Sequence, residues 1–345
     1  MIRQHGKLTF LSFLLVVLCG NTFAQKIPVI PLDLDSLITV GYATGSLKTL
    51  SGSVEKITEK QMNKDQVTNP LEAIRGRVPG LTIQRGTNGL AALDAVRLRG
   101  TTSLTSGNDP LIIVDGVFGD LSMLTSIYPT DIESFTILKD ASETAQYGSR
   151  GASGVIEVTT KKGMQGRTQV AYNGSFGIST VYKNLKMLSG DEFRSVASER
   201  GISILDKGNN TNFQKEIQQT GLQQNHHVAF YGGSSTSSYR VSLGFMDRQG
   251  VILNEDMKNF TSNMNMNQKM FDGFFDCELG MFGSILKNHN LVDYQKTFYS
   301  AATFNPTYPN HKDPVTNSWD GITTASQITN PLAWMQVDDD DATSH

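Results

Sequence analysis

Three aspartates are the first candidates for chemistry, because a group of carboxylates can transfer protons or bind cations. They are Asp115, Asp131 and Asp140. Each stands in a turn signal or at the end of an apolar run, where an aspartate caps the local backbone. The sequence contains no Gly-x-Ser-x-Gly motif, no metal-binding helix motif and no phosphate-binding loop. We therefore expect a protein that is not an enzyme, and a hydrolase assay would test this expectation.

Histidines and a cysteine are the next candidates, as metal ligands or nucleophiles. His226 and His227 are adjacent, and His289 follows later in the chain. Adjacent side chains on a strand point to opposite faces, so the pair cannot chelate one ion from the same side. We expect no metal and no cofactor. Cys277 is left alone once a leader containing Cys19 is removed, which predicts no intrachain disulfide and a thiol that acts as a small hydrophobe.

Three short apolar runs surround the aspartates, at residues 111–114, 135–138 and 155–158. They are long enough for strands and too short for helices, and Gly, Pro or Asp bounds each run. Asp115 and Gly116 form a tight-turn signal, because glycine tolerates positive φ. The runs and their turns predict a small mixed α/β domain with buried central strands.

The residues around these runs resemble the plug domain of the SusC/RagA family of TonB-dependent outer-membrane importers. The resemblance rests on several ordered motifs: Arg97-Leu98-Arg99-Gly100-Thr101, Pro110-Leu111-Ile112-Ile113-Val114-Asp115-Gly116, Leu138-Lys139-Asp140-Ala141, Tyr147-Gly148-Ser149-Arg150-Gly151 and Gly154-Val155-Ile156. It implies that residues 47–163 form a plug seated in the lumen of a barrel.

The candidate plug carries a basic cluster that lacks the glycines of a phosphate cradle: Arg75, Arg77, Arg85, Arg97 and Arg99. One interpretation is that these arginines pair with acidic residues of the barrel lumen and hold the plug in place. The other is that they are ordinary surface arginines. The net charge of the whole chain is −3, which argues against a strongly basic nucleic-acid binder. We expect no nucleic-acid partner.

The N-terminal residues have the features of an export signal. Two basic residues precede the apolar stretch 8–19, which is too short to span a bilayer. Residues 1–24 are therefore predicted to be a signal peptide that directs the chain to the cell envelope and, by the resemblance, to the outer membrane. A lipid-modified Cys19 is the alternative, which the bulky Leu18 before it disfavours.

Residues 25–46 are predicted to be a linker that contains a short β-prone segment: Ser36, Leu37, Ile38, Thr39, Val40, Gly41 and Tyr42. A free strand is a template to which another strand can add. In the family, a similar segment is the TonB box, which the periplasmic protein TonB captures by strand pairing. The alternative is that this segment is the first strand of the plug sheet.

From residue 164 the sequence alternates with a period of two. Tyr239, Val241, Leu243 and Phe245 alternate with Arg240, Ser242, Gly244 and Met246, and the same alternation recurs in 168–178, 260–269 and 275–281. One face of each strand is therefore apolar and the other polar. In a membrane barrel the apolar face meets lipid and the polar face lines the lumen, whereas a soluble sandwich would show the same pattern. With the plug before them, residues 164–345 are predicted to be the first strands and loops of a transmembrane β-barrel.

The length of the chain limits this barrel. At about 20 residues for a strand with its turn, residues 164–345 hold on the order of eight strands, while plugged outer-membrane transporters have about 22. A closed barrel of eight strands is filled by its own side chains and has no room for a plug. We expect the N-terminal portion of an importer, from a truncated or split gene or an incomplete sequence. The acidic run at 338–341 is expected in a solvated loop rather than at a cation site.

The resemblance implies a function and its partners. The function is TonB-dependent import of a nutrient of the glycan or peptide class, in which the plug gates the pore. The partners are TonB, a SusD-like surface lipoprotein and outer-membrane lipid. The alternative is an envelope binding or sensor fragment that conducts nothing, or a non-functional remnant.

Overall fold

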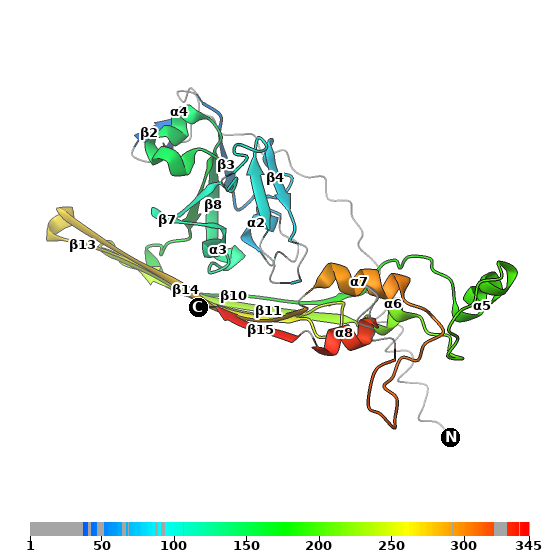
Figure 1. The fold of residues 1–345 in the computed structure, drawn as a ribbon. Helices are drawn as coiled ribbons and strands as arrows, with labels where there is room; N and C mark the ends of the chain where they lie inside the picture. The colour runs from blue at the N-terminus through cyan, green and yellow to red at the C-terminus, as the bar shows by residue number, and fades with distance from the viewer. Residues whose placement is uncertain are drawn as a thin grey trace, which may run out of the picture.

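The structure is a computed structural model that describes residues 37–40, 43–46, 52–63, 67, 69–86, 89–90, 94–105, 107–291, 293–320, 330–337 and 339–344. The predicted signal peptide lies outside the described residues. Figure 1 shows two parts of the molecule: residues 52–163, called the plug from here on, lie over one face of a long second sheet, called the wall sheet.

The plug is built on a mixed five-stranded sheet with the strand order β3-β8-β9-β6-β7. The strands are β3 (Val54–Thr58), β6 (Leu111–Val114), β7 (Val117–Gly119), β8 (Ile132–Leu138) and β9 (Val155–Thr160). β6 and β9 are parallel, and the other neighbours are antiparallel. A separate two-stranded sheet pairs β4 (Leu81–Gln84) with β5 (Ala95–Leu98). The strands predicted from the three apolar runs are confirmed.

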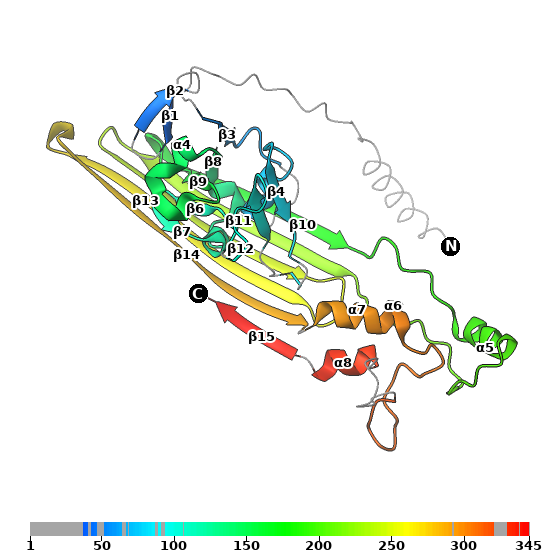
Figure 2. The ribbon, with the colours of Figure 1, turned by 45° about the horizontal axis from the view of Figure 1, so that its top comes forward.

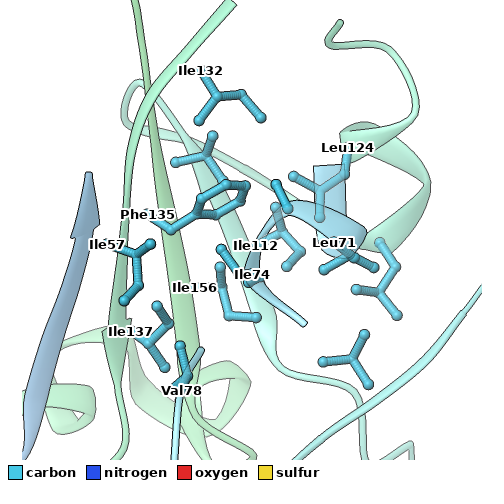
Figure 3. Close-up of a cluster of buried hydrophobic side chains, with 14 of the residues drawn as sticks. Ile57, Leu71, Ile74, Val78, Ile112, Leu124, Ile132, Phe135, Ile137 and Ile156 are labelled. Atoms are coloured by element: carbon cyan, nitrogen blue, oxygen red, sulfur yellow. The ribbon is translucent and has the colours of Figure 1, made fainter. Parts of the chain in front are cut away.

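Short helices close the plug over this sheet: α2 (Pro70–Ile74), α3 (Leu121–Leu124), α4 (Ala141–Thr144) and the 3₁₀ helices η1 (Pro129–Asp131) and η2 (Ala145–Gly151). α2 begins at Pro70, where the missing N–H costs nothing, and the Asn69 side chain caps it by accepting from the Leu71 N–H. Figure 3 shows the resulting core, with Phe135 of β8 at its centre. Phe135 is fully buried, and burial of such a side chain contributes about 1.5–3 kcal/mol.

The wall sheet is antiparallel, and its strands follow one another in chain order. They are β10 (Gly166–Ser179), β11 (Gly221–Gly233), β12 (Ser237–Gln249), β13 (Asp256–Met270), β14 (Phe275–Leu291) and β15 (Asp339–Ser344). Figure 2 shows these strands side by side, with β10 and β15 at the two edges of a sheet that does not close. The fold is therefore an α/β plug followed by antiparallel strands of an incomplete β-barrel.

The two faces of the wall sheet differ as the period of two predicts. On the face away from the plug, apolar side chains are exposed, with Val170 at 62% and Met281 at 60%. On the face toward the plug, Arg240, Ser242 and Asn263 are buried. Apolar side chains therefore face outward, where a barrel meets lipid, and polar ones face the plug.

The wall strands are fewer and longer than expected. The described residues after 163 form six strands, of which β10 to β14 have 13 to 17 residues each. Two long connections follow β10 and β14 and carry α5 (Gly190–Glu199), α6 (Phe213–Glu216), α7 (Tyr294–Thr303) and α8 (Pro331–Val337). The estimate of about eight strands is wrong because it left out these connections. The acidic run is also not a loop, since residues 339–341 belong to β15.

The two long connections and the turn between β12 and β13 share an apolar cluster that is distinct from the plug core. It includes Phe213 and Phe304 of the connections and Ile252 of the turn. Among the described residues, no helix is both long enough and apolar enough to cross a membrane.

The end of the wall sheet that is opposite the long connections has short turns. There the 3₁₀ helix η3 (Phe271–Gly273) turns the chain between β13 and β14.

Candidate functional site

The plug meets the wall sheet at η1, the short helix that leads into β8. Pro129 starts η1, and Asp131 ends it with a side chain that is only 2% exposed. The backbone at this point is fixed from within the plug, because the Asp131 carbonyl accepts a hydrogen bond of 2.7 Å from the Lys161 N–H. The sequence predicted only a capping role for Asp131, yet the structure aims its carboxylate at the wall sheet.

Three wall side chains surround the Asp131 carboxylate. Arg240 Nη2 donates to Oδ1 at 2.9 Å, and Ser242 Oγ donates to Oδ2 at 2.6 Å. His227 Nε2 lies 3.0 Å from Oδ2. These wall residues come from the plug-facing positions of two neighbouring strands, because Ser242 of β12 is opposite Ala229 of β11. The four residues are called the Asp131 cluster.

The Asp131 cluster keeps its carboxylate charged although it is buried. Burial alone raises the pKa of Asp131, but the hydrogen bonds and charge of His227, with those of Ser242 and Arg240, outweigh burial and hold this pKa below its ordinary value. Removing one partner of such a buried pair costs about 3–5 kcal/mol, because the other charge is left uncompensated. The cluster therefore fastens the plug to the wall sheet at one point.

Tyr128 packs against the wall sheet beside the Asp131 cluster. Its ring stacks on the His227 ring with centroids 4.6 Å apart. Burial and the nearby Asp131 charge raise the pKa of Tyr128 to about 12, so its hydroxyl stays neutral. A Cβ at Gly244 would collide with Thr261 Oγ1 of β13 and would lie 2.5 Å from Tyr128 Cδ2, so glycine at this position of β12 leaves room for both the neighbouring strand and the plug.

A second contact lies where the chain leaves the plug. Asp115 and Gly116 both have positive φ and form the tight turn between β6 and β7, as predicted. The Asp115 carboxylate accepts from the Thr160 N–H at 2.9 Å and from Thr160 Oγ1 at 2.5 Å. Asn265 of the wall sheet donates to the same Thr160 hydroxyl at 3.2 Å. The predicted turn therefore connects to the wall through one threonine.

The rest of the plug–wall contact is polar. Several buried polar atoms there have no hydrogen-bond partner among the described residues: Thr130 Oγ1, Gln223 Nε2, Asn225 Oδ1, Thr261 Oγ1 and Asn263 Nδ2. An unpaired buried polar group costs about 1–3 kcal/mol, and ordered water usually satisfies such groups. Phe282 is the wall residue that packs against the plug core in the described structure. This contact resembles a transient protein interface more than a shared hydrophobic core.

The predicted basic cluster does not fasten the plug to the wall. Arg75 pairs with Asp94 at 3.8 Å, Arg85 with Glu72 at 3.0 Å, and Arg99 with Asp140, so these three pairs lie within the plug. The interpretation that these arginines pair with acidic lumen residues is wrong for all three. At the Asp131 cluster the arrangement is the reverse, because the acid, Asp131, is on the plug and the arginine, Arg240, is on the wall.

The other motif residues lie inside the plug. Lys139 pairs with Glu55 at 2.6 Å, and the Asp140 carboxylate accepts from the Ser53 N–H at 2.5 Å. The remaining positions are placed as follows: Arg97 in β5, Gly100 at φ 102° beside Arg99, Tyr147 hydrogen-bonded to Glu157, Gly148 at φ 62°, Arg150 over the Phe118 ring, and Gly154 against Leu98. These contacts brace the plug and do not converge on one site.

The TonB-box-like segment is paired within its own hairpin. β1 (Leu37–Val40) pairs with β2 (Ala43–Ser46) in a two-stranded sheet that is separate from the plug sheet. The segment is therefore neither the unpaired strand that we expected nor the first strand of the plug sheet. Ser36, Gly41 and Tyr42 lie outside the described residues.

The histidines and the cysteine lie where the period of two puts them. His227 faces the plug, whereas His226 lies on the other face of β11, where its ring stacks with Tyr172 at 6.2 Å between centroids. Cys277 is exposed on the apolar face of β14. Sequence reasoning missed His227 and Arg240 as site residues, although their polar, plug-facing positions were the available signal.

A plug fastened to the polar face of an antiparallel sheet is the arrangement that part of a TonB-dependent receptor would have, and the comparisons with known proteins agree. The family described as TonB-dependent Receptor Plug Domain matches residues 46–155 of the chain.

Similarity to individual proteins shows which group of TonB-dependent receptors the chain belongs to. The chain is 34% identical to the TonB-dependent receptor SusC of Bacteroides thetaiotaomicron over 316 residues, which are 86% of this chain and 31% of that protein. It is also 34% identical to a TonB-dependent receptor of Formosa agariphila, over 77% of this chain and 26% of that protein. The structure of the RagAB peptide importer in its open-open state matches with a TM-score of 0.72 at 25% identity, covering 86% of this chain and 38% of that one. The chain belongs to the SusC/RagA family of TonB-dependent receptors, and it spans about a third of the length of the curated relatives that it matches.

Proposed function

We propose that this chain supplies the plug and the first wall strands of a TonB-dependent outer-membrane importer for a nutrient of the glycan or peptide class. The observation that carries the proposal is the contrast at η1: a separately packed plug rests on a polar wall through one buried charged cluster. This arrangement suits a domain that must stay closed at rest and move when it is pulled. It suits neither a catalytic centre nor a permanently fused core.

The proposed gate is held by the Asp131 cluster and released from the N-terminal side. β1 and β2 form an isolated hairpin, so its outer strand edges have no partner in the plug sheet. Such an edge accepts a further strand by backbone hydrogen bonds. TonB would add to this segment and pull, and the pull would break the few charged and polar contacts between the plug and the wall sheet.

The proposed partners follow from the family, from the two different ends of the wall sheet and from its apolar outer face. TonB acts at the Ser36–Tyr42 segment in the periplasm. The long connections with α5 to α8 lie beyond the other end of the wall sheet (Figure 1), where a SusD-like lipoprotein would meet the receptor. The apolar outer face of the wall sheet would contact outer-membrane lipid. Residues 1–24 would be the signal peptide that brings the chain there.

Deleting Ser36–Tyr42 tests the proposal in the receptor expressed from its gene. We expect TonB-dependent uptake to be lost while ligand binding at the cell surface is kept. The matched control deletes the seven residues Gln25–Pro31, which shortens the tether equally and leaves the segment intact. Uptake that survives the loss of Ser36–Tyr42 would refute the assignment.

A further inference from the structure

A cavity lies at the end of the wall sheet where the long connections begin. It has a volume of about 590 Å³, within the range of pockets that bind small ligands. Several parts of the chain line it, including Ser179 at the end of β10 and Glu255 in the turn between β12 and β13. The plug contributes Arg85 and Gly89, the end of β12 contributes Arg248, and α7 contributes Tyr294 and Phe298. A ligand in this cavity would therefore touch the plug and the wall at the same time.

The cavity contains a guanidinium group without a partner. In the described part of the chain, the side chain of Arg248 makes no hydrogen bond or ion pair. It is close enough to Arg85 for the two charges to repel each other, and Glu72 and Glu255 attract it over a distance. Arg85 is already paired with Glu72 at 3.0 Å. Among the charged side chains of this cavity, Arg248 is the cation that no carboxylate contacts directly, so an anion is favoured beside its guanidinium group.

Glu255 does not neutralise Arg248 by direct contact. Its side chain is buried, 3% exposed, at the turn between β12 and β13, where it attracts Arg248 only over a distance. Burial raises the pKa of Glu255, and a hydrogen bond from the Leu90 N–H of the plug opposes this rise. A Cβ at Gly250 would lie 2.0 Å from Glu255 Oε2, so the carboxylate is held against that turn.

An aromatic surface stands beside the cation. Tyr294 and Phe298 lie one turn apart on α7, with ring centroids 4.9 Å apart, and Phe298 is 38% exposed. Aromatic faces pack against the flat face of a sugar ring or against an apolar side chain. A guanidinium fork matches a carboxylate, which it can bind through two parallel hydrogen bonds.

We propose that this cavity binds a carboxylate group of the imported ligand, with Arg248 as its partner and α7 as the surface on which the adjoining ring or side chain packs. The inference rests on the proposed function, because both ligand classes named there can supply a carboxylate, as a uronic acid or as a peptide. Bound between Arg248 and Arg85, the anion would relieve their repulsion and connect the wall to the plug.

The test measures binding to the receptor purified in detergent. Isothermal titration calorimetry compares trigalacturonate with neutral maltotriose, and a triglutamate peptide with amidated triglutamine. One acidic probe is expected to bind more tightly than its neutral counterpart, and which one binds identifies the source of the carboxylate. Arg248→Gln is expected to weaken that binding roughly 10- to 100-fold, the range for losing a charged hydrogen-bond partner.

Two further variants separate the effect of the guanidinium group from that of positive charge alone and from that of an arginine elsewhere in the wall sheet. Arg248→Lys preserves the charge without the fork, and its affinity should fall between those of the wild type and Arg248→Gln. Arg167→Gln makes the same change at the short-turn end of the wall sheet and should leave binding unchanged. Equal binding of acidic and neutral probes, no binding of either acidic probe, or wild-type affinity in Arg248→Gln would overturn the inference. Binding in detergent needs no TonB, so this result is independent of the uptake experiment with the Ser36–Tyr42 deletion.

Discussion

Inside the plug, Phe135 and its neighbours pack without access to solvent, whereas the plug meets the wall sheet through Asp131, His227 and Arg240. The plug core is apolar and its stability grows with the area removed from water. The plug–wall contact is polar, and its buried ion pair is offset by the cost of removing the charges from water. The difference separates two tasks. The core keeps the plug folded, and the contact decides whether the plug stays in place.

The largest effect is expected from a change in the plug core. Phe135→Ala should destabilise the plug by about 3–5 kcal/mol, because it removes a fully buried ring and leaves a cavity. Hydrogen–deuterium exchange of β8 and β9 amides in the purified receptor would measure the loss. Phe275→Ala, at a half-exposed position of the outer wall face, is the matched control and should leave plug exchange unchanged. Equal exchange in both variants would mean that the plug has no core of its own.

A change in the Asp131 cluster should loosen the plug without unfolding it. Asp131→Asn keeps the size of the side chain and one hydrogen-bonding oxygen but removes the charge. We therefore expect a loss of about 2–3 kcal/mol, less than the cost of removing the whole partner. Exchange should rise at residues 126–131 and stay low in β8 and β9. Combining this variant with Arg240→Gln should cost less than the sum of the single changes, because both remove the same pair. Additive effects would contradict the assigned pairing.

Gly244→Ala tests how closely the plug must approach the wall. The added methyl group would meet the Tyr128 ring of the plug and the Thr261 hydroxyl of β13, and overpacking of this kind costs about 1–3 kcal/mol. Gly283→Ala is the control in β14, because no atom lies within 4 Å of the Cβ that it adds. Protection of residues 126–131 from exchange should fall in the first variant only. A similar fall in both would show that wall glycines matter for the strands rather than for the plug.

The smallest expected effect is the dependence of the plug–wall contact on pH, which comes from the charge of Asp131 and is not seen at neutral pH. Its pKa in the folded protein is lower than the ordinary 3.8, so its contribution is fully present above that value. The contribution is lost as the pH falls through the lower folded value. Exchange at residues 126–131, corrected for the intrinsic rate, should therefore rise below pH 3.8 relative to β8 and β9. Asp131→Asn should lack this dependence, and an unchanged profile would mean that another group controls it.

The sequence predicted the plug better than it predicted the contact. Residues 111–114 and 155–158 are local apolar runs with turn residues at their ends, so their strands follow from nearby residues alone. The inward position of Arg240 likewise follows from the period of two. Its pairing with Asp131 joins residues 109 positions apart, and nothing in either neighbourhood specifies the partner. The prediction that the arginines at 75, 85 and 99 pair with acidic lumen residues failed for the same reason, because a charge does not reveal which opposite charge the fold brings to it.

Locking the plug to the wall tests the central claim most directly. Ser126 of the plug and Ser284 of β14 are in contact, with their hydroxyl oxygens 3.1 Å apart, so cysteines at both positions are close enough for a disulfide. In a receptor that also carries Cys277→Ser, oxidation of this pair should abolish TonB-dependent uptake while ligand binding persists, and reduction should restore uptake. Undiminished uptake by the fully oxidised receptor would contradict the claim that the plug must move away from this face of the wall.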